Sequence, residues 1–236
     1  MLDCDLRAHR VSVVMPVLNE DSRIVRQMES ILAVPGVHEV IVVDGGSRDR
    51  TLDLVRGTPS VTLLVAPKGR ASQMNAGAQA ATGDVLLFLH ADVRLPLDGM
   101  HWVAEALSDP QVIAGAFRTW TVSEGSRTWL APLLHLADLR SRYTSLPYGD
   151  QALFVRAEVF RQLGGFPEQP LMEDLEFSRR LRRLGSVRTV PATVQVSGRR
   201  FLSRPLYYAL LVNIFPLLYR LGMPPRVLAT LYADPR

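Results

Sequence analysis

An α/β fold, with a mostly parallel central sheet flanked by helices in the Rossmann-like manner, is predicted by three features of the sequence. Short runs of β-branched residues alternate with amphipathic segments through the first half of the chain, as βαβ units require. The 236 residues, 47% of them hydrophobic, suffice for one sizeable core. Polar residues directly follow three of the predicted strands, at the edge where open α/β sheets bind ligands.

The elements of the first half follow in a regular order. Val11 to Met15 predicts a buried strand that Pro16 ends. Apolar residues then recur at helical spacing over 24–32, until Pro35-Gly36 closes that helix. Further strands are expected at 40–43, 61–65 and 85–89, with a small-residue helix around 74–81 before the last of them.

The second half is less regular. Strands are expected near 112–117 and 152–155, with a helical stretch around 129–139. No repeat or charged linker interrupts the chain, so we expect one domain over residues 1–197 and a basic, apolar helical tail over 198–236.

The charge is unevenly distributed. The formal net charge is +4, yet eleven arginines stand against two acidic residues from Glu176 to Arg236. This end should face an anionic partner such as phosphate or a membrane surface. No nucleic-acid-binding signature accompanies the charge, so nucleic acid is not an expected partner. The single Cys4 and the absence of a secretion signal favour a cytoplasmic location.

The stretches that end the predicted strands carry a resemblance. VSVVMPVLNE, VIVVDGGSRDRT and GDVLLFLHADVRLP resemble the successive nucleotide-sugar motifs of family 2 glycosyltransferases, which have the GT-A fold. With PYGDQALFVR, GGFPEQPLMEDLEFSRRLRRLG and SGRR, the chain is similar to a bacterial subgroup associated with selenium or radical-SAM genes and arsenosugar biosynthesis. The resemblance implies a nucleotide-sugar half over about 8–117 and an acceptor half over about 118–197.

Residues on the nucleotide side are implied by the same resemblance. Pro16, Glu20 and Asp44 would hold the nucleoside base and ribose of a UDP- or GDP-sugar, uridine being the family's commoner choice. Gly45 and Ser47 belong to the same loop, where glycine lets the backbone approach a ligand closely. Asp44 before two glycines is also a common turn residue.

A second stretch adds to the nucleotide side. PKGRASQMNAG matches the family's next element, which implies that Lys68, Arg70 and Asn75 line the nucleotide. A solvated surface lysine remains the alternative for Lys68.

A divalent metal is implied by the motif His90-Ala91-Asp92. It stands where the family has Asp-X-Asp, whose last aspartate coordinates the metal that bridges the two phosphates. Mg²⁺ or Mn²⁺ suits an oxygen ligand such as Asp92. Two interpretations of His90 stay open, direct ligation of the metal and a supporting core imidazole.

A general base is implied by a later motif. Leucines at one face predict a helix that starts near Glu173 and stops at Gly185, so its first turn carries carboxylates, whose ionised form the helix dipole favours. The match to the family's Glu-Asp element implies that Asp174 deprotonates the acceptor hydroxyl, with inversion at the sugar, and that Glu173 orients acceptor or base. Acidic residues in a first turn are also common for helix stability alone.

Three further residues have weaker signals. Asp150 could hold sugar hydroxyls, although a Gly-Asp turn is the commoner meaning of such a pair. Arg199 or Arg200 could clamp the diphosphate, or belong to a solvated basic patch.

The apolar stretch 204–220 is too short to span a bilayer. It suits an interfacial helix at the inner face of the membrane, or a helix packed on the catalytic domain or on a second copy of the chain.

Two other functions compete with sugar transfer. A sugar nucleotidyltransferase needs a glycine-rich basic loop after the first strand, where PVLNEDSR is acidic instead. A non-catalytic nucleotide-sugar-binding protein is supported by His90, and Asp92 and Asp174 argue against it.

Overall fold

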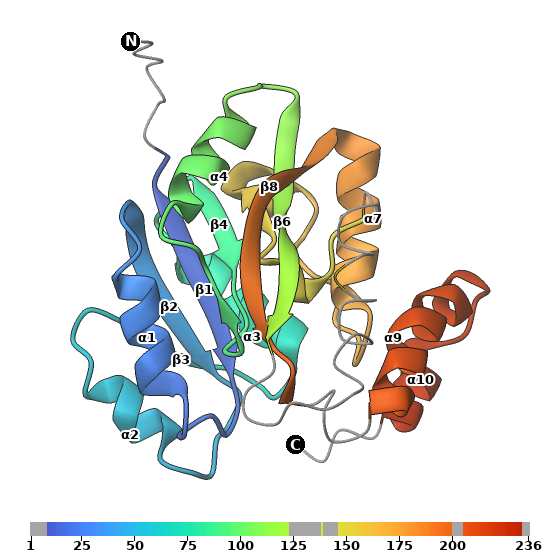
Figure 1. Ribbon diagram of the computed structural model, residues 1–236, viewed down its shortest axis with the longest axis horizontal. Helices are drawn as coiled ribbons and strands as arrows, with labels where there is room; N and C mark the ends of the chain where they lie inside the picture. Colours follow the sequence, from blue (N-terminus) through green and yellow to red (C-terminus); the bar gives the residue numbers. More distant parts are fainter. Residues whose placement is uncertain (1–8, 123–137, 139–145, 200–204, 233–236) are drawn as a thin grey trace.

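The computed structural model describes residues 9–122, 138, 146–199 and 205–232 (Figure 1). The first half contains β1 (Val11–Val17), α1 (Ile24–Leu32), β2 (Val37–Asp44), α2 (Thr51–Arg56), β3 (Thr62–Val65), α3 (Arg70–Ala80), β4 (Val85–Phe88), β5 (Val93–Arg94), α4 (Gly99–Leu107) and β6 (Val112–Val122). The second half contains η1 (Gly149–Gln151), β7 (Phe154–Arg156), α6 (Ala157–Gln162), α7 (Glu173–Leu184), β8 (Ser186–Ser197), α9 (Pro205–Arg220) and α10 (Pro225–Tyr232). The predicted helix at 129–139 lies outside the described residues except for Asp138.

The central sheet confirms the predicted α/β class. Its strand order is β3-β2-β1-β4-β7-β6-β8-β5. β1 runs parallel to β2 and β4, and β2 runs parallel to β3, so four strands of the first half end at one edge. β7 pairs antiparallel with both β4 and β6, which carries the sheet into the second half of the chain.

Both faces of the sheet are covered, which explains the unbroken apolar character of its central strand. Every residue of β1 is buried. Val13 and Met15 pack in a cluster with α1 and α4, while Val14 packs on the other face with residues of α3, α6 and α7. Central strands of parallel sheets have this composition because helices lie on both sides of them.

Strand β8 was not predicted, because Pro191 and alternating exposed residues obscure its pattern. It pairs in parallel with β6, but the register skips from Thr189 opposite Ala116 to Thr193 opposite Arg118. Pro191 lies within this irregularity, where a strand tolerates a residue that lacks an N–H. The end of β8 then approaches β5, where Val196 faces Val93.

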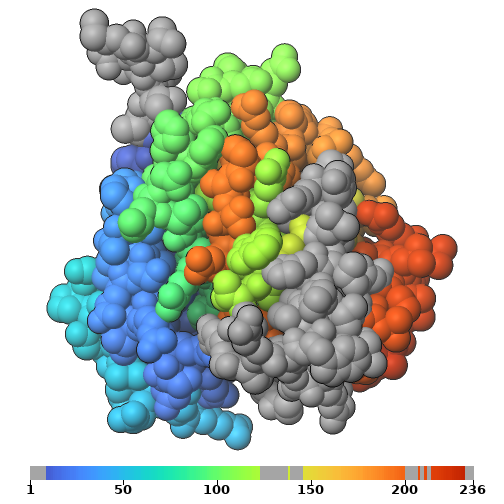
Figure 2. All heavy atoms as spheres, in the orientation of Figure 1, coloured from blue at the N-terminus to red at the C-terminus, as the bar shows by residue number. Residues whose placement is uncertain are grey.

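The C-terminal helices α9 and α10 lie at one edge of the molecule, beside α7 (Figures 1 and 2). Leu211 and Phe215 of α9 and Leu228 of α10 are buried against Leu171, which precedes α7. Tyr219 extends this contact, because its hydroxyl donates to Glu176 Oε2 at 3.3 Å. Across the described part of the chain, every helix is too short or too polar to cross a membrane.

Candidate active site

A cleft of about 280 Å³ opens at the carboxyl ends of β1 and β4. It is lined by seven of the predicted site residues, Pro16, Glu20, Lys68, Arg70, His90, Ala91 and Asp92. They come from three separate stretches of chain, which the parallel strands bring to one edge of the sheet. Leu171 and Ala229 close another side of the cleft, so helix α10 of the tail contributes to its wall.

Glu20 carries a buried charge at the mouth of this cleft. Its residue is 4% exposed, and Arg199 Nη2 lies 3.0 Å from each of its carboxylate oxygens. The backbone N–H of Glu20 donates to Thr51 Oγ1 at 2.9 Å, which fixes the turn after β1. A buried carboxylate needs such a cationic partner. Arg200 lies outside the described residues.

Asp44 holds the loop after β2 in place. It is fully buried, and its Oδ2 accepts the N–H groups of Gly46 at 2.7 Å and Ser47 at 2.9 Å. The Ser47 hydroxyl donates to Asp44 Oδ1 and accepts the N–H of Asn19 at 2.9 Å. Asp44 therefore orders the loops that follow both β1 and β2 from within the protein.

Gln73 is a cleft residue that the sequence analysis missed. Its Nε2 donates to the carbonyl oxygens of Val17 at 2.8 Å and Val43 at 2.7 Å, which ties together the ends of β1 and β2. An ideal Cβ on Gly45 would lie 2.9 Å from Gln73 Cδ, so this close packing requires a glycine. The sequence offered only a glutamine among small residues near the start of α3, which by itself does not indicate a buried role.

Asn75 lies away from the cleft. Its side-chain amide donates to Phe166 O and accepts from Phe166 N, both at 2.9 Å. This pair of bonds fixes the turn before residue 167, where Gly164 and Gly165 have positive φ angles. The structure therefore does not bring Asn75 together with the other predicted nucleotide residues.

Gly149 lies between the predicted base, Asp174, and His90 of the His-Ala-Asp motif. Its N–H donates to Asp174 Oδ2 at 2.6 Å, and Asp174 Oδ1 accepts the N–H of Leu175 at 2.7 Å. An ideal Cβ on Gly149 would lie 2.8 Å from His90 Cε1, 3.0 Å from His90 Nε2 and 3.2 Å from Asp174 Oδ2. The His90 ring and the Asp174 carboxylate therefore lie against the same glycine, although 84 positions separate them in the chain.

Glu173 is buried beneath this site. It is 2% exposed, and its Oε1 lies 2.8 Å from Arg70 Nε. Within the described residues its Oε2 is buried without a hydrogen-bond partner. Burial raises the pKa of Glu173 above its ordinary value, Arg70 acts in the opposite direction, and the neighbouring Asp174 raises it further. Glu173 thus positions Arg70 on the cleft wall.

Backbone strain gathers around the same residues. Asn19, Ala152 and Met172 have φ angles of 53°, 47° and 65°, and they are the three non-glycine residues with positive φ in the described chain. Asn19 precedes Glu20, Ala152 follows η1, and Met172 precedes Glu173. Such conformations cost about 1–3 kcal/mol each and concentrate at functional sites.

Asp92 offers an oxygen ligand for a divalent metal, since it lines the cleft and is partly exposed. Among the described side chains, no cluster of three or more acidic, histidine or cysteine residues could hold a metal alone. A bound diphosphate could supply the further oxygens that Mg²⁺ or Mn²⁺ at Asp92 would need. The imidazole edge of His90 faces Gly149 and Asp174. Asp150, in η1 next to Gly149, is half-buried.

The sequence profile described as Glycosyl transferase family 2 matches residues 12–164. An undecaprenyl-phosphate 4-deoxy-4-formamido-L-arabinose transferase of Pseudomonas aeruginosa is 28% identical over 158 residues, which cover 62% of this chain and 46% of that protein. The probable glycosyltransferase YdaM of Bacillus subtilis is 24% identical over 211 residues, which cover 78% of this chain and 50% of that protein. The chain thus spans about half the length of these relatives.

Two solved structures share the fold. The mannosyltransferase PcManGT from Pyrobaculum calidifontis, in complex with GDP-Man and Mn²⁺, gives a TM-score of 0.63 at 21% identity over 96% of this chain and 70% of that chain. S. aureus TarS in complex with UDP-GlcNAc gives a TM-score of 0.63 at 20% identity over 80% of this chain and 58% of that chain. The sheet and its flanking helices are those of GT-A glycosyltransferases.

Proposed function

The chain belongs to glycosyl transferase family 2 and is a glycosyltransferase, and from this premise we propose that it transfers a sugar from a UDP- or GDP-sugar to an acceptor hydroxyl with inversion. One observation carries the proposal. Asp174 and His90 lie against the same glycine, so the base implied by one motif lies beside the diphosphate-binding motif. A single displacement needs the base and the donor's anomeric carbon in one place.

Asp174 is the proposed general base. Each of its oxygens accepts one backbone N–H, from Gly149 and Leu175, so the carboxylate is oriented and each oxygen retains a second acceptor site. In the reaction, the acceptor O–H proton moves to Asp174 as the acceptor oxygen forms a bond to the anomeric carbon. The bond from that carbon to the diphosphate breaks on the opposite side, and the nucleoside diphosphate leaves with the electron pair.

The nucleotide side of the proposal uses the cleft after β1 and β4. Pro16 and Glu20 would border the nucleoside, and Lys68 and Arg70 give the cleft wall positive charge. Glu173 holds Arg70 there through its buried ion pair. Asp44 contributes by ordering the loops beneath the nucleoside.

Asp92 and the bound diphosphate would together hold Mg²⁺ or Mn²⁺. The bound ion would supply charge stabilisation for the departing diphosphate. His90 is proposed to support the site from the side of Gly149, where its ring edge lies. Arg199, 33% exposed at its side chain, is proposed to serve both Glu20 and the donor's phosphates.

A lipid-linked acceptor is a further part of the proposal. The Pseudomonas relative is named for undecaprenyl-phosphate. Leu210 and Leu217 of α9 are 57% and 55% exposed, and Leu221, just after α9, is 76% exposed. Arg220 is the last residue of α9, and Arg226 lies in the first turn of α10. Exposed apolar side chains beside arginines suit the inner surface of an anionic membrane.

The membrane part of the proposal has its own test. The intact chain should co-sediment with anionic liposomes, and the variant Leu217→Ser/Leu221→Ser should stay in the supernatant. The control is Leu184→Ser, because Leu184 is 46% exposed but lies on α7. If all three proteins sedimented equally, the proposed membrane contact of the tail would be wrong, while the proposal of sugar transfer would still stand.

Sugar transfer is tested by nucleotide binding followed by turnover. A thermal-shift panel of nucleoside diphosphates with Mg²⁺ and Mn²⁺ identifies the base, and release of nucleoside diphosphate from the matching sugar donor measures turnover. Asp174→Asn should retain nucleotide binding and lower kcat by about 10²–10⁴-fold, the contribution of a general base. Asp53→Asn is the control, because that carboxylate is 78% exposed on α2. Normal turnover by Asp174→Asn would refute the assigned base.

A further inference from the structure

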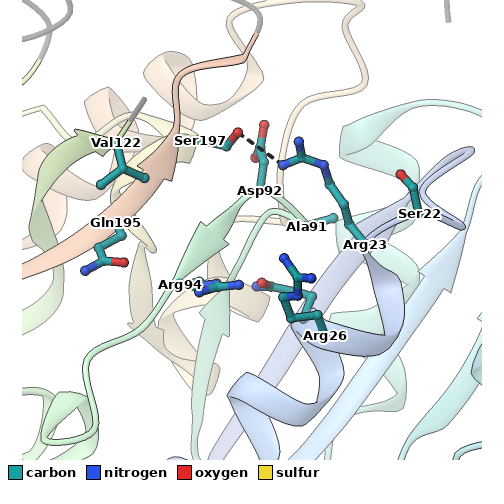
Figure 3. Close-up of a pocket in the computed structure, with 10 residues that line it drawn as sticks. Ser22, Arg23, Arg26, Ala91, Asp92, Arg94, Val122, Gln195 and Ser197 are labelled. Atoms are coloured by element: carbon teal, nitrogen blue, oxygen red, sulfur yellow. Dashed lines mark hydrogen bonds between the residues drawn. The ribbon is translucent and has the colours of Figure 1, made fainter. Parts of the chain in front are cut away.

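A second cavity, of about 250 Å³, lies across Ala91 and Asp92 from the nucleotide cleft. The two cavities share these two residues and no others among the lining residues described. The second cavity lies between the first turn of α1, strand β5 and the ends of β6 and β8 (Figure 3). None of the roles proposed above uses this cavity.

Three arginines dominate its wall. Arg23 and Arg26 come from the start of α1, and Arg94 extends from β5 toward Arg26 (Figure 3). Buried contacts set this arrangement, because Gln27 is 4% exposed and its Nε2 donates to Val93 O at 2.5 Å. That bond ties α1 to β5, so the backbones that carry the three arginines are fixed on opposite sides of one cavity.

The cavity has an excess of positive charge. In the part of the chain that the structure describes, Arg26 and Arg94 form no ion pair, and the first turn of α1 contains no acidic residue. A helix N-terminus itself carries partial positive charge, so arginines at this place are unfavourable unless an anion offsets them. Asp92 is the single acidic residue on the described wall.

Arg23 is already oriented toward the shared wall. Its Nη1 donates to Ser197 Oγ at 3.1 Å, which connects α1 to the end of β8 (Figure 3). The next residues after Ser197 lead to Arg199, whose guanidinium lies on Glu20 in the first cavity. Positive charge therefore continues from the second cavity to the mouth of the nucleotide cleft.

We propose that Arg23, Arg26 and Arg94 form a subsite for an acidic oxygen group, phosphate or carboxylate, of the acceptor. This inference rests on the proposed sugar transfer, because it assigns the first cavity to the donor. Guanidinium groups bind such oxyanions through paired charge-assisted hydrogen bonds. An acceptor held there by its acidic group would approach the donor across Asp92. The subsite thus selects an anionic acceptor over a neutral sugar or alcohol.

The subsite is tested with inorganic phosphate as the probe. Isothermal titration measures phosphate binding to the full chain, first alone and then with Mg²⁺ and a saturating nucleoside diphosphate. Phosphate should bind in both cases, because the nucleotide occupies a different cavity. The variant Arg26→Gln/Arg94→Gln should weaken phosphate binding about 100-fold, at about tenfold for each charged hydrogen-bond donor lost. Its nucleotide affinity should stay within about twofold of wild type.

The matched control is Arg182→Gln/Arg183→Gln. It removes the same charge from exposed positions at the end of α7, and it should leave phosphate binding unchanged. Both pairs of arginines are exposed, so the variants should fold, and their thermal unfolding verifies this. Arg94→Glu provides a second variant, which should abolish phosphate binding by charge reversal.

Three outcomes would overturn the subsite. Wild type could fail to bind phosphate, the Arg26/Arg94 variant could bind it normally, or the nucleotide could displace it competitively. The last result would assign the arginines to the donor's diphosphate. Failure of every nucleoside diphosphate to bind would instead refute the donor part of the proposed function, and phosphate titration of the nucleotide-free chain would still report on the arginines.

Discussion

Replacing Gly149 with alanine would test the contact between the proposed base and the His-Ala-Asp motif. The new methyl carbon would lie 2.8 Å from His90 Cε1, whereas contacting carbons prefer about 3.5–4.0 Å. The same carbon would lie 3.2 Å from Asp174 Oδ2, so the ring and the carboxylate would both be displaced. The φ angle of Gly149 is not positive, so its backbone conformation is open to alanine. The cost of the substitution comes from the contacts with His90 and Asp174.

The expected displacement is about 0.7 Å or more, the shortfall in the carbon contact. Misplacement of about 1 Å can cost about 10²-fold in rate, so we expect kcat to fall about 10–100-fold. Overpacking should also lower the free energy of unfolding by about 1–3 kcal/mol. Nucleotide affinity should change less than kcat, because of the groups displaced only His90, and not Gly149 or Asp174, lines the nucleotide cleft among the residues described.

The assay is release of nucleoside diphosphate from the sugar donor, together with urea unfolding of the same preparations. Gly57→Ala is the matched control, since its Cβ would meet nothing closer than 3.5 Å and its φ of −71° suits alanine. A Gly149→Ala protein with wild-type kcat would contradict this prediction, because it would show that catalysis does not depend on the positions of His90 and Asp174 relative to each other.

Three other substitutions test separate contacts. Arg199→Ala should raise the donor KM and lower the free energy of unfolding by about 1–3 kcal/mol, because buried Glu20 loses the two hydrogen bonds that Arg199 donates; unchanged KM and stability would contradict this. Gln73→Leu should lower the unfolding free energy by about 1–3 kcal/mol, since the carbonyl oxygens of Val17 and Val43 each lose one hydrogen bond, while Val17 O keeps the bond from Gly45 N–H; an unchanged urea midpoint would show that the lost bonds do not stabilise the fold. Glu173 has a raised pKa in the folded protein, so the folded state keeps a proton that the unfolded state loses as pH rises above 4.5. The free energy of unfolding, measured with urea from pH 4.5 to 8, should therefore fall for wild type relative to Glu173→Gln as pH rises. A wild-type protein that became more stable than Glu173→Gln as pH rises would contradict the raised pKa of Glu173.

Most of the strands in the first half could be predicted because their signals are local, whereas the short elements α2, β5 and α4 were not expected. β1 is apolar throughout since both faces of the sheet are covered, and α1 begins at Ile24 and ends at Leu32, where its apolar spacing placed it. β8 could not be predicted in the same way. It is stabilised by pairing with β6 around a register irregularity at Pro191, and that long-range contact leaves no local pattern.

In the candidate site, too, residues with a local sequence signal could be predicted and residues that depend on long-range contacts could not. Residues that directly follow strands, such as Glu20 and Asp92, could be expected at one edge because parallel strands place them there. Gln73 and Gly149 could not, because their importance comes from contacts with Val17, Val43, His90 and Asp174 that only the folded chain creates. The roles of all these residues in binding and transfer stay predictions.

The proposed transfer requires Asp92 and Asp174 to act on the same donor molecule. Crystals grown with Mn²⁺ and the nucleoside diphosphate that the thermal-shift panel selects would test it through the anomalous scattering of manganese. We expect a manganese peak bonded to Asp92 and to diphosphate oxygens, with the terminal phosphate directed toward Asp174. A nucleotide bound elsewhere, or a manganese ion without contact to Asp92, would contradict it.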